Sequence, residues 1–352
     1  MSDDATTTAG GIGRRDFLKI GGAATAGLLA GGIAPEPVRA GAPPLPHNPR
    51  TQGAMPTRNL GKTGYRVGLF SLGGQAAVEK ADNEAVAVPI IERALDRGVN
   101  YVDTAAGYGG PQRWSQRYIG QVMARRRREA FLTSKTHDRT KDGSLRLLDE
   151  SLRMLNTDHL DLWQLHRVTT MQDVEQIFAP GGAIEALQQA KEQRMVRFLG
   201  VTGHSDPGVL MEMLRRFPFD TILMALNAAD RHQRAFAPEL LPLAVERQMG
   251  IIGMKIPARG RILATWSPQP GANQAAWEQA ARPGTITIRD AMYFTLSLPV
   301  STVIIGCDTL AQVEENVRLA QEFTPLSETQ LAALAARTEP IARQALFFRT
   351  WS

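Results

Sequence analysis

The feature that most constrains the fold of this chain is an eightfold alternation between short apolar runs and amphipathic stretches, which begins near residue 60. Each apolar run has the length of a buried strand, and each precedes a plausible helix. The runs cover residues 68–74, 99–105, 130–136, 160–166, 196–204, 221–227, 250–255 and 301–307. Eight such alternations predict an α/β protein of one domain, a (β/α)8 TIM barrel with a closed parallel sheet.

A doubly wound open sheet is the alternative to the barrel. Such sheets usually carry a glycine-rich G-x-G-x-x-G fingerprint after the first strand. No such fingerprint follows any of the eight runs, and a G-x-x-x-x-G-K-[ST] phosphate loop does not occur, so the barrel is favoured. Within it, Gly98 is expected to end the helix over residues 83–98. Asp142 or Ser144 is expected to cap the helix after the third strand.

Composition and charge exclude several classes of protein. Hydrophobic residues make up 43% of the chain and charged residues 21%, which is typical of globular proteins and not of disordered or membrane proteins. A net charge of +5 over 352 residues requires no polyanionic partner, so no nucleic acid is expected to bind. The arginine run at residues 125–128 is interpreted as a solvated helix end, with a docking patch as the alternative. Because Cys307 is the only cysteine, no disulfide can form within the chain.

The N-terminal 40 residues have the plan of a signal peptide. Arg14 and Arg15 precede an uncharged run rich in glycine and alanine, and small residues around Ala40 indicate a cleavage site. The run is too short and too weakly apolar for a stable membrane anchor. The string "RRDFLK" resembles the twin-arginine (Tat) motif, which directs folded proteins across the bacterial cytoplasmic membrane. We therefore expect transient contact with the Tat export machinery and a periplasmic or exported location; the alternative is an extension with chance arginines.

The remaining segments outside the alternation are assigned from their composition. Residues 41–59 are Pro-rich and aperiodic, so they are expected to form a spacer before a barrel over residues 60–325. Residues 326–352 are expected to form a C-terminal helix and an apolar tail. In that tail, Phe347, Phe348 and Trp351 are expected to dock on the barrel.

Four ionisable residues stand where strands of the predicted barrel end. They are Asp103, Tyr108, Lys135 and His166. The carboxyl ends of barrel strands meet at one mouth, so we expect these side chains to converge. A lysine ammonium about 4 Å from a phenol favours the phenolate by ~4 kcal/mol at an effective dielectric constant of 20, before desolvation opposes it. Such a site can protonate an oxygen as negative charge develops there, which hydride addition to a carbonyl requires.

These strand ends lie in motifs that resemble the aldo-keto reductase superfamily over residues from about 57 to 323. The motifs are "NLGKTGYRVGLFSLGG", "DTAAGYG", "TSK", "LDLWQLH", "FLGVTGH" and "VIIGCDTLAQVEEN". The resemblance implies an NAD(P)(H)-dependent oxidoreductase that reduces an aldehyde or ketone to an alcohol, or catalyses the reverse reaction. It implies Tyr108 as general acid and base, with a pKa lowered by Lys135. Asp103 would anchor Lys135, and His166 would orient the substrate carbonyl.

The resemblance also implies a cofactor site, although part of the family pattern is missing. Thr202 and Gly203, then Leu223, stand where the family usually has the Ser-Asn pair and the Gln that hold the nicotinamide carboxamide. Lys255 stands where an aromatic residue often stacks on the nicotinamide. The predicted cofactor contacts are Gly73, Gly74, Gln75, Thr202, Asn227, Lys255, Arg259, Arg261, Gly306, Cys307, Asp308, Gln312, Glu315 and Asn316. No metal site is predicted.

The choice between NADP(H) and NAD(H) is expected to be weak. Many relatives place cations shortly after the last strand and on the next helix, where they meet the 2′-phosphate of the phosphorylated cofactor. Asp308 and Gln312 occupy those positions here. An aspartate would repel the phosphate, whereas it could accept a hydrogen bond from a 2′-hydroxyl.

Two other functions remain open at this stage. The chain could be a sensor or accessory module that keeps the reductase fold and cofactor but turns over little, as the missing carboxamide contacts allow. It could also be a Schiff-base aldolase that uses Lys135, although that chemistry requires a neutral amine and Asp103 would keep the lysine charged. The carbonyl substrate cannot be deduced from the sequence.

Overall fold

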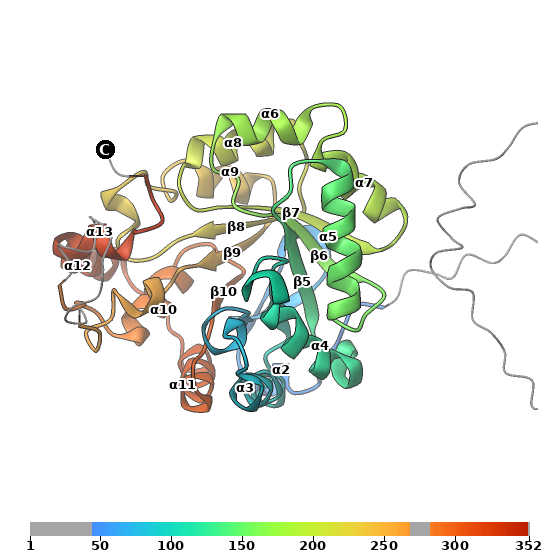
Figure 1. The fold of residues 1–352 in the computed structure, drawn as a ribbon. Helices are drawn as coiled ribbons and strands as arrows, with labels where there is room; N and C mark the ends of the chain where they lie inside the picture. Colours follow the sequence, from blue (N-terminus) through green and yellow to red (C-terminus); the bar gives the residue numbers. More distant parts are fainter. Residues whose placement is uncertain (1–43, 268–281, 351–352) are drawn as a thin grey trace, which may run out of the picture. The chain divides into compact units, whose positions relative to one another are not determined.

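The computed structural model describes residues 44–267 and 282–350 (Figure 1). The predicted signal peptide, its cleavage site and Trp351 of the predicted apolar tail lie outside these residues. Within them, no helix combines the length and the apolar character that crossing a membrane requires.

Eight parallel strands close into a barrel, which confirms the predicted fold. Their order around the barrel is β10-β3-β4-β5-β6-β7-β8-β9, so the first and last strands of the barrel pair with each other. The strands are β3 (Phe70–Gly73), β4 (Tyr101–Asp103), β5 (Phe131–Thr136), β6 (Leu160–Leu165), β7 (Val196–Gly203), β8 (Thr221–Ala225), β9 (Gly250–Met254) and β10 (Thr302–Ile305). All eight fall within the predicted apolar runs, because a strand buried on both faces reads as a continuous apolar segment.

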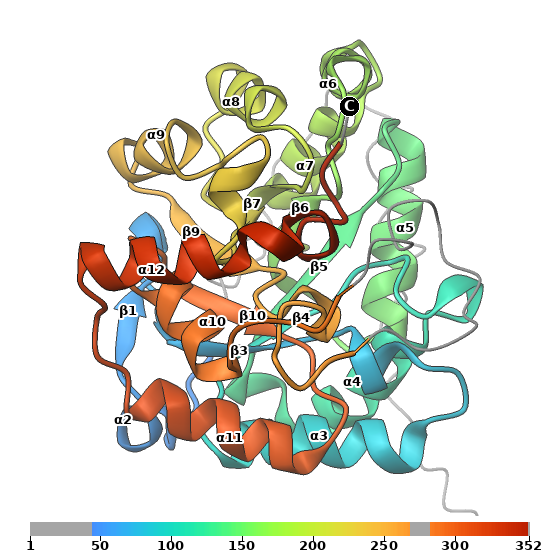
Figure 2. The ribbon, with the colours of Figure 1, turned by 90° about the vertical axis from the view of Figure 1, so that its left-hand side faces the viewer.

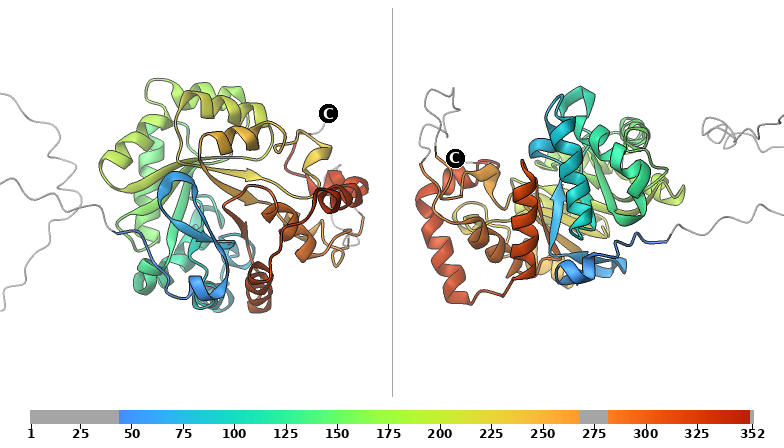
Figure 3. Two further views of the ribbon diagram at one scale, coloured as in Figure 1. Left: turned by 180° about the vertical axis from the view of Figure 1, so that it is seen from behind. Right: turned by 90° about the horizontal axis from the view of Figure 1, so that it is seen from below.

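Helices pack around the strands and enclose the main apolar core between sheet and helices. α3 and α11 lie side by side, as Figures 2 and 3 show from two directions. The helices around the sheet are α3 (Glu84–Asp96), α4 (Trp114–Arg126), α5 (Lys141–Met154), α6 (Met171–Phe178), α7 (Ala183–Glu192), α8 (Pro207–Arg216), α9 (Leu240–Glu246), α10 (Ile288–Leu296) and α11 (Leu310–Gln321).

One predicted helix end is confirmed and one is wrong. Gly98 follows α3 with a φ of +82°, the left-handed conformation expected of a helix-ending glycine. The cap of α5 is Thr140, whose hydroxyl accepts a hydrogen bond from Gly143 N, and not Asp142 or Ser144. The Asp138 carboxylate fixes Thr140 in this role, because it accepts hydrogen bonds from both the backbone N and the hydroxyl of Thr140.

The described part of the segment predicted as a spacer, residues 44–59, is folded onto the barrel. It contains α2 (Thr51–Ala54) and β1 (Thr57–Asn59), which pairs with β2 (Arg66–Gly68) in a hairpin. The Asn48 amide donates to the carbonyls of Leu95 and Val99, and the Thr51 hydroxyl donates to Gly98 O. Proline-rich composition suggested a spacer, but these long-range bonds anchor the chain, and only tertiary structure supplies them.

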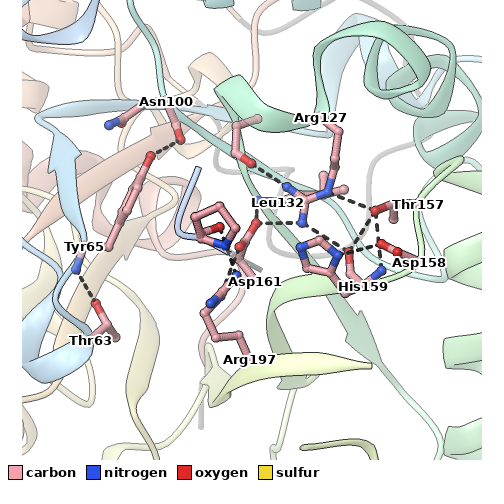
Figure 4. Close-up of polar contacts among 12 residues, drawn as sticks. Thr63, Tyr65, Asn100, Arg127, Leu132, Thr157, Asp158, His159, Asp161 and Arg197 are labelled. Atoms are coloured by element: carbon pink, nitrogen blue, oxygen red, sulfur yellow. Dashed lines mark hydrogen bonds and ion pairs between the residues drawn. The ribbon is translucent and has the colours of Figure 1, made fainter. Parts of the chain in front are cut away.

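The hairpin covers the end of the barrel where the strands begin (Figure 3, left). Leu60, between β1 and β2, is fully buried in the cluster that fills the barrel interior with Tyr101 and Phe131. Beside them, Tyr65 donates its hydroxyl hydrogen bond to Asn100 O (Figure 4). This end is therefore closed by packing, which leaves the opposite end for chemistry.

A buried carboxylate organises the same end of the barrel. Asp161 on β6 is fully buried and lies 2.8 Å from Arg127 and 3.5 Å from Arg197 (Figure 4). It also accepts a hydrogen bond from Leu132 N. Arg127 belongs to the arginine run at residues 125–128, so that run is not only a solvated helix end: this guanidinium is 15% exposed and stabilises a buried anion.

The C-terminal segment crosses the end of the barrel where the strands finish (Figure 2). It contains α12 (Glu328–Thr338) and α13 (Ala342–Ala345), and Phe347 and Phe348 then pack against the core. Arg349 is buried, with an ion pair of 2.5 Å to Asp230 and hydrogen bonds to the carbonyls of Ala225 and His204. These bonds hold the end of the chain beside the carboxyl ends of β7 and β8.

Candidate active site

A buried ion pair lies where β4 and β5 end. The Lys135 ammonium is 2.6 Å from the Asp103 carboxylate and also donates to Thr104 O at 2.7 Å. The side chains are 1% and 2% exposed, respectively. The second carboxylate oxygen of Asp103 accepts the hydroxyl of Thr133 at 2.8 Å. The register that places Asp103 beside Thr133 therefore also fixes the direction in which the carboxylate faces.

Tyr108 and His166 lie beside this pair. The Lys135 nitrogen is 5.1 Å from the centre of the Tyr108 ring, and the rings of Tyr108 and His166 meet edge to face at 5.6 Å. Tyr108 stands in the turn after β4, and His166 directly follows β6. The four predicted catalytic residues therefore come together, as expected from strand ends that share one mouth.

The direction in which the pKa of Tyr108 is shifted differs from the expectation. Burial raises the pKa of the phenol well above 10, with further increases from the negative charges of Asp103 and Glu79, while Arg259 and Arg167 oppose them. Burial lowers the pKa of Lys135, and Asp103 opposes that change. Burial therefore outweighs any lowering of the Tyr108 pKa by Lys135, whose ammonium is hydrogen-bonded to Asp103 and to Thr104 O.

Two histidines at the mouth are neutral. Burial lowers the pKa of His166 well below 6.5, and the positive charge of Lys135 adds to the effect. Burial lowers the pKa of His204 in the same way, with Lys255 as the largest charge contribution. A neutral imidazole carries one N–H, so His166 retains a hydrogen-bond donor without a charge. His204 was not among the predicted site residues, although it directly follows β7 as His166 follows β6.

A cavity of about 780 Å³ opens beside Tyr108 and Asp103. Its walls come from the segments after β3, β9 and β10 and from α11. Ten predicted cofactor contacts line it: Gly73, Gly74, Gln75, Lys255, Arg259, Gly306, Asp308, Gln312, Glu315 and Asn316. A volume of this size is within the usual range for ligand pockets.

Glycines among the cavity-lining residues allow neighbouring backbone segments to approach closely. A Cβ at Gly73 would lie 2.9 Å from Gly306 N, and one at Gly74 would lie 2.4 Å from Asp103 O. The segments after β3 and β10 therefore approach each other backbone to backbone. Together with the cations Lys255 and Arg259 in the wall, this cradle fits a phosphate-bearing dinucleotide.

A chain of polar contacts crosses the cavity wall at Lys255. Its ammonium donates to the Gln75 side chain at 3.1 Å, and the Gln75 amide donates to Glu79. Burial lowers the pKa of Lys255 to about 8, with the charge of Arg259 acting in the same direction. The charge of Lys255 therefore changes close to physiological pH.

Four predicted cofactor contacts do not line the cavity. Asn227 is buried, and its amide donates to the carbonyls of Lys255 and Ala345. Thr202 accepts a hydrogen bond from Arg167 N. Cys307 is buried against Asn316, and Arg261 lies over the ring of Phe347 at 4.7 Å.

Glu79 and Lys80 line the cavity after β3, and neither was among the predicted site residues. Lys80 forms an ion pair of 2.6 Å with Asp308, which follows β10. These two residues are 228 positions apart in the chain, so no local pattern could have indicated their contact.

Comparison with known proteins agrees with this geometry. The family model described as "Aldo/keto reductase family" matches residues 66–339. The chain is 26% identical over 309 residues to an L-galactose dehydrogenase of Arabidopsis thaliana, covering 81% of this chain and 94% of that protein.

Solved structures show the same fold. The holo form of aldo-keto reductase AKR11C1 from Bacillus halodurans is similar, with a TM-score of 0.65, 26% identity, and coverage of 80% of this chain and 96% of that one. A Klebsiella pneumoniae aldo/keto reductase, solved in complex with NADP and acetate, is similar with a TM-score of 0.61 and 22% identity over 78% of this chain and 93% of that one. At 22% identity, the similarity to the Klebsiella pneumoniae protein shows the fold alone.

Proposed function

The chain belongs to the aldo/keto reductase family and is an NAD(P)-dependent oxidoreductase; from this premise we propose that it reduces an aldehyde or ketone to an alcohol, or catalyses the reverse, with Tyr108 as general acid and base. The observation that carries the proposal is the buried Lys135–Asp103 pair beside Tyr108 and His166, at the edge of a cavity that fits a dinucleotide. A nicotinamide dinucleotide, when bound there, supplies or accepts the hydride.

The chain's own residues manage the proton. In the reductive direction, the Tyr108 hydroxyl donates its proton to the carbonyl oxygen as negative charge develops on that oxygen. The neutral His166 ring donates a hydrogen bond to the same oxygen and orients it. Lys135 stabilises the phenolate that remains, and Asp103 positions the ammonium for this role.

Tyr108 is tested by removing only its hydroxyl. Tyr108→Phe should abolish carbonyl reduction while dinucleotide affinity stays within a few-fold, because the phenol acts on the substrate. Tyr293→Phe is the control: Tyr293 is a buried tyrosine that packs edge to face on Phe323 and does not line the cavity. Wild-type turnover by Tyr108→Phe would exclude this role.

Aldoses are the first substrates to test, since one relative is an L-galactose dehydrogenase. The two alternative functions predict different results. A sensor module would bind the dinucleotide but show no turnover with any aldose or simple aldehyde. An aldolase would be trapped on Lys135 by borohydride in the presence of substrate, yet two hydrogen bonds already hold that ammonium.

We further propose that residues 1–40 direct export through the Tat pathway, with cleavage near Ala40 and a periplasmic or exported location. The twin arginines, Arg14 and Arg15, support this proposal.

A further inference from the structure

The ion pair between Lys80 and Asp308 bridges the rim of the cavity, and the function proposed above does not use it. Lys80 comes from the segment after β3, and Asp308 comes from the segment after β10. Their charged atoms are 2.6 Å apart, and the side chains are 59% and 49% exposed. The pair lies at the end of the cavity formed by Gln312, Glu315 and Asn316 of α11.

The backbone on both sides of the pair is held in place. Ala77 N donates to Cys307 O, which joins the two segments directly. The buried Tyr118 donates its hydroxyl hydrogen bond to Lys80 O. On the other side, Asp308 N donates to the side chain of Gln312. Because the backbone is anchored while the side chains are exposed, Lys80 can change partners without movement of the loop.

Other cations near this end of the cavity are already engaged. Arg318 pairs with Glu322 at 2.7 Å, and Arg97 pairs with Glu314 at 2.8 Å. Among the lining residues of the described chain, the cations are Lys80, Lys255 and Arg259, and the last two come from the segment after β9. Lys80 is the one paired with Asp308.

We propose that Lys80 receives the 2′-phosphate of a phosphorylated dinucleotide, and that Asp308 competes with this phosphate for the Lys80 ammonium. The proposal rests on the dinucleotide-binding function proposed above. A half-exposed ion pair contributes little to stability, so its exchange for another anion is inexpensive. A 2′-phosphate carries up to two charges and attracts Lys80 more strongly than one carboxylate does.

This competition predicts weak discrimination between the cofactors. Without the 2′-phosphate, Asp308 keeps Lys80 as its partner. With it, Lys80 moves to the phosphate, and Asp308 is left without its partner near an anion of like charge. The two effects oppose each other, so the wild type favours neither cofactor strongly. When Asp308 is replaced, the 2′-phosphate should bind Lys80 without a competing carboxylate.

Calorimetric titration of the full chain tests the proposal without measuring activity. The probes are adenosine 2′,5′-bisphosphate and 5′-AMP, followed by NADPH and NADH. Lys80→Met should weaken binding of the 2′-phosphorylated probes about tenfold, because one charge-assisted contact is lost. The affinities for 5′-AMP and NADH should stay within about twofold of the wild-type values. Asp308→Asn should strengthen binding of the phosphorylated probes about fivefold, because both the competitor and the repulsion are removed.

Lys141→Met is the matched control, because Lys141 also forms an exposed ion pair, at 3.3 Å with Glu185, away from the cavity. It should leave all four affinities unchanged. Equal weakening of phosphorylated and unphosphorylated probes by Lys80→Met would overturn the inference, as would an unchanged ratio of affinities in Asp308→Asn. A wild type that binds none of the four nucleotides would instead refute the proposed function.

Discussion

Replacing Asp103 by Asn should destabilise the fold through the lysine that it leaves behind. Lys135 is 1% exposed, so its ammonium has no access to water when the carboxylate is gone. At 2.6 Å and an effective dielectric constant of 20, the Coulomb attraction that is lost amounts to about 6 kcal/mol. Relaxation and the remaining bond to Thr104 O reduce this value, and breaking a buried pair typically costs about 3–5 kcal/mol. We expect the free energy of unfolding to fall by that amount at pH 7.

The pH dependence gives a second test of the same reasoning. Burial lowers the pKa of Lys135, and Asn removes the main opposing charge. The folded protein then releases the lysine proton at a lower pH than the unfolded chain does, so stability rises as the pH increases through the folded-state pKa. The destabilisation of Asp103→Asn should therefore be smaller at pH 9 than at pH 7.

Urea unfolding followed by tryptophan fluorescence measures these energies, since Trp163 is buried in the core. Thr133→Val is the control, because it removes the hydrogen bond that the Thr133 hydroxyl donates to the Asp103 carboxylate but leaves both charges in place, and it should cost about 1.5–3 kcal/mol. Asp103→Asn/Lys135→Met should be more stable than Asp103→Asn alone. A loss of less than about 1 kcal/mol in Asp103→Asn would refute the argument. So would a double variant that is no more stable than Asp103→Asn.

Three further predictions concern other parts of the chain. Dinucleotide affinity should fall about tenfold between pH 7 and pH 9, because Lys255, with a pKa of about 8, loses its charge. In Lys255→Met, the affinity measured over the same pH range should stay constant. Arg349→Met should lower the free energy of unfolding by about 3–5 kcal/mol. The loss should be smaller at pH 5 than at pH 8, because burial raises the pKa of Asp230 and the carboxyl can then take up a proton. Equal losses of stability at both pH values would contradict this. A reporter that must fold before export, fused to residues 1–45, should reach the periplasm, and the change of Arg14 and Arg15 to Lys should block it; continued export of the double variant, measured by cell fractionation, would exclude the Tat route.

The predictions that agree with the structure rest on patterns of neighbouring residues in the sequence. A strand buried on both faces must be apolar along its length, so eight runs of such residues predict eight barrel strands. In a parallel barrel, the residue after each run must stand at the same mouth. Asp103, Lys135 and His166 could therefore be placed together from their positions at strand ends, before any contact between them was known.

The predictions that failed, or that remain predictions, depend on which partners a side chain meets in the folded chain. Thr140 caps α5 because Asp138 holds it, and Asn48 anchors a Pro-rich stretch by bonding to carbonyls 47 and 51 residues away. Asn227 matched the family pattern for a cofactor contact, yet its amide bonds backbone carbonyls in the structure. Sequence position could not distinguish a side chain that faces the cavity from one that bonds within the core.

The sequence by itself determined that this chain forms a closed parallel barrel and that an acid, a lysine, a tyrosine and a histidine meet at its mouth. Closure of the barrel decided the rest, because it pairs β3 with β10 and so places Lys80 against Asp308 across 228 residues. Burial decided the pKa shifts of the site as well: it raises the pKa of Tyr108 and lowers that of His166. A pKa depends on the surroundings of a group in three dimensions, so residue type and spacing alone could not supply it.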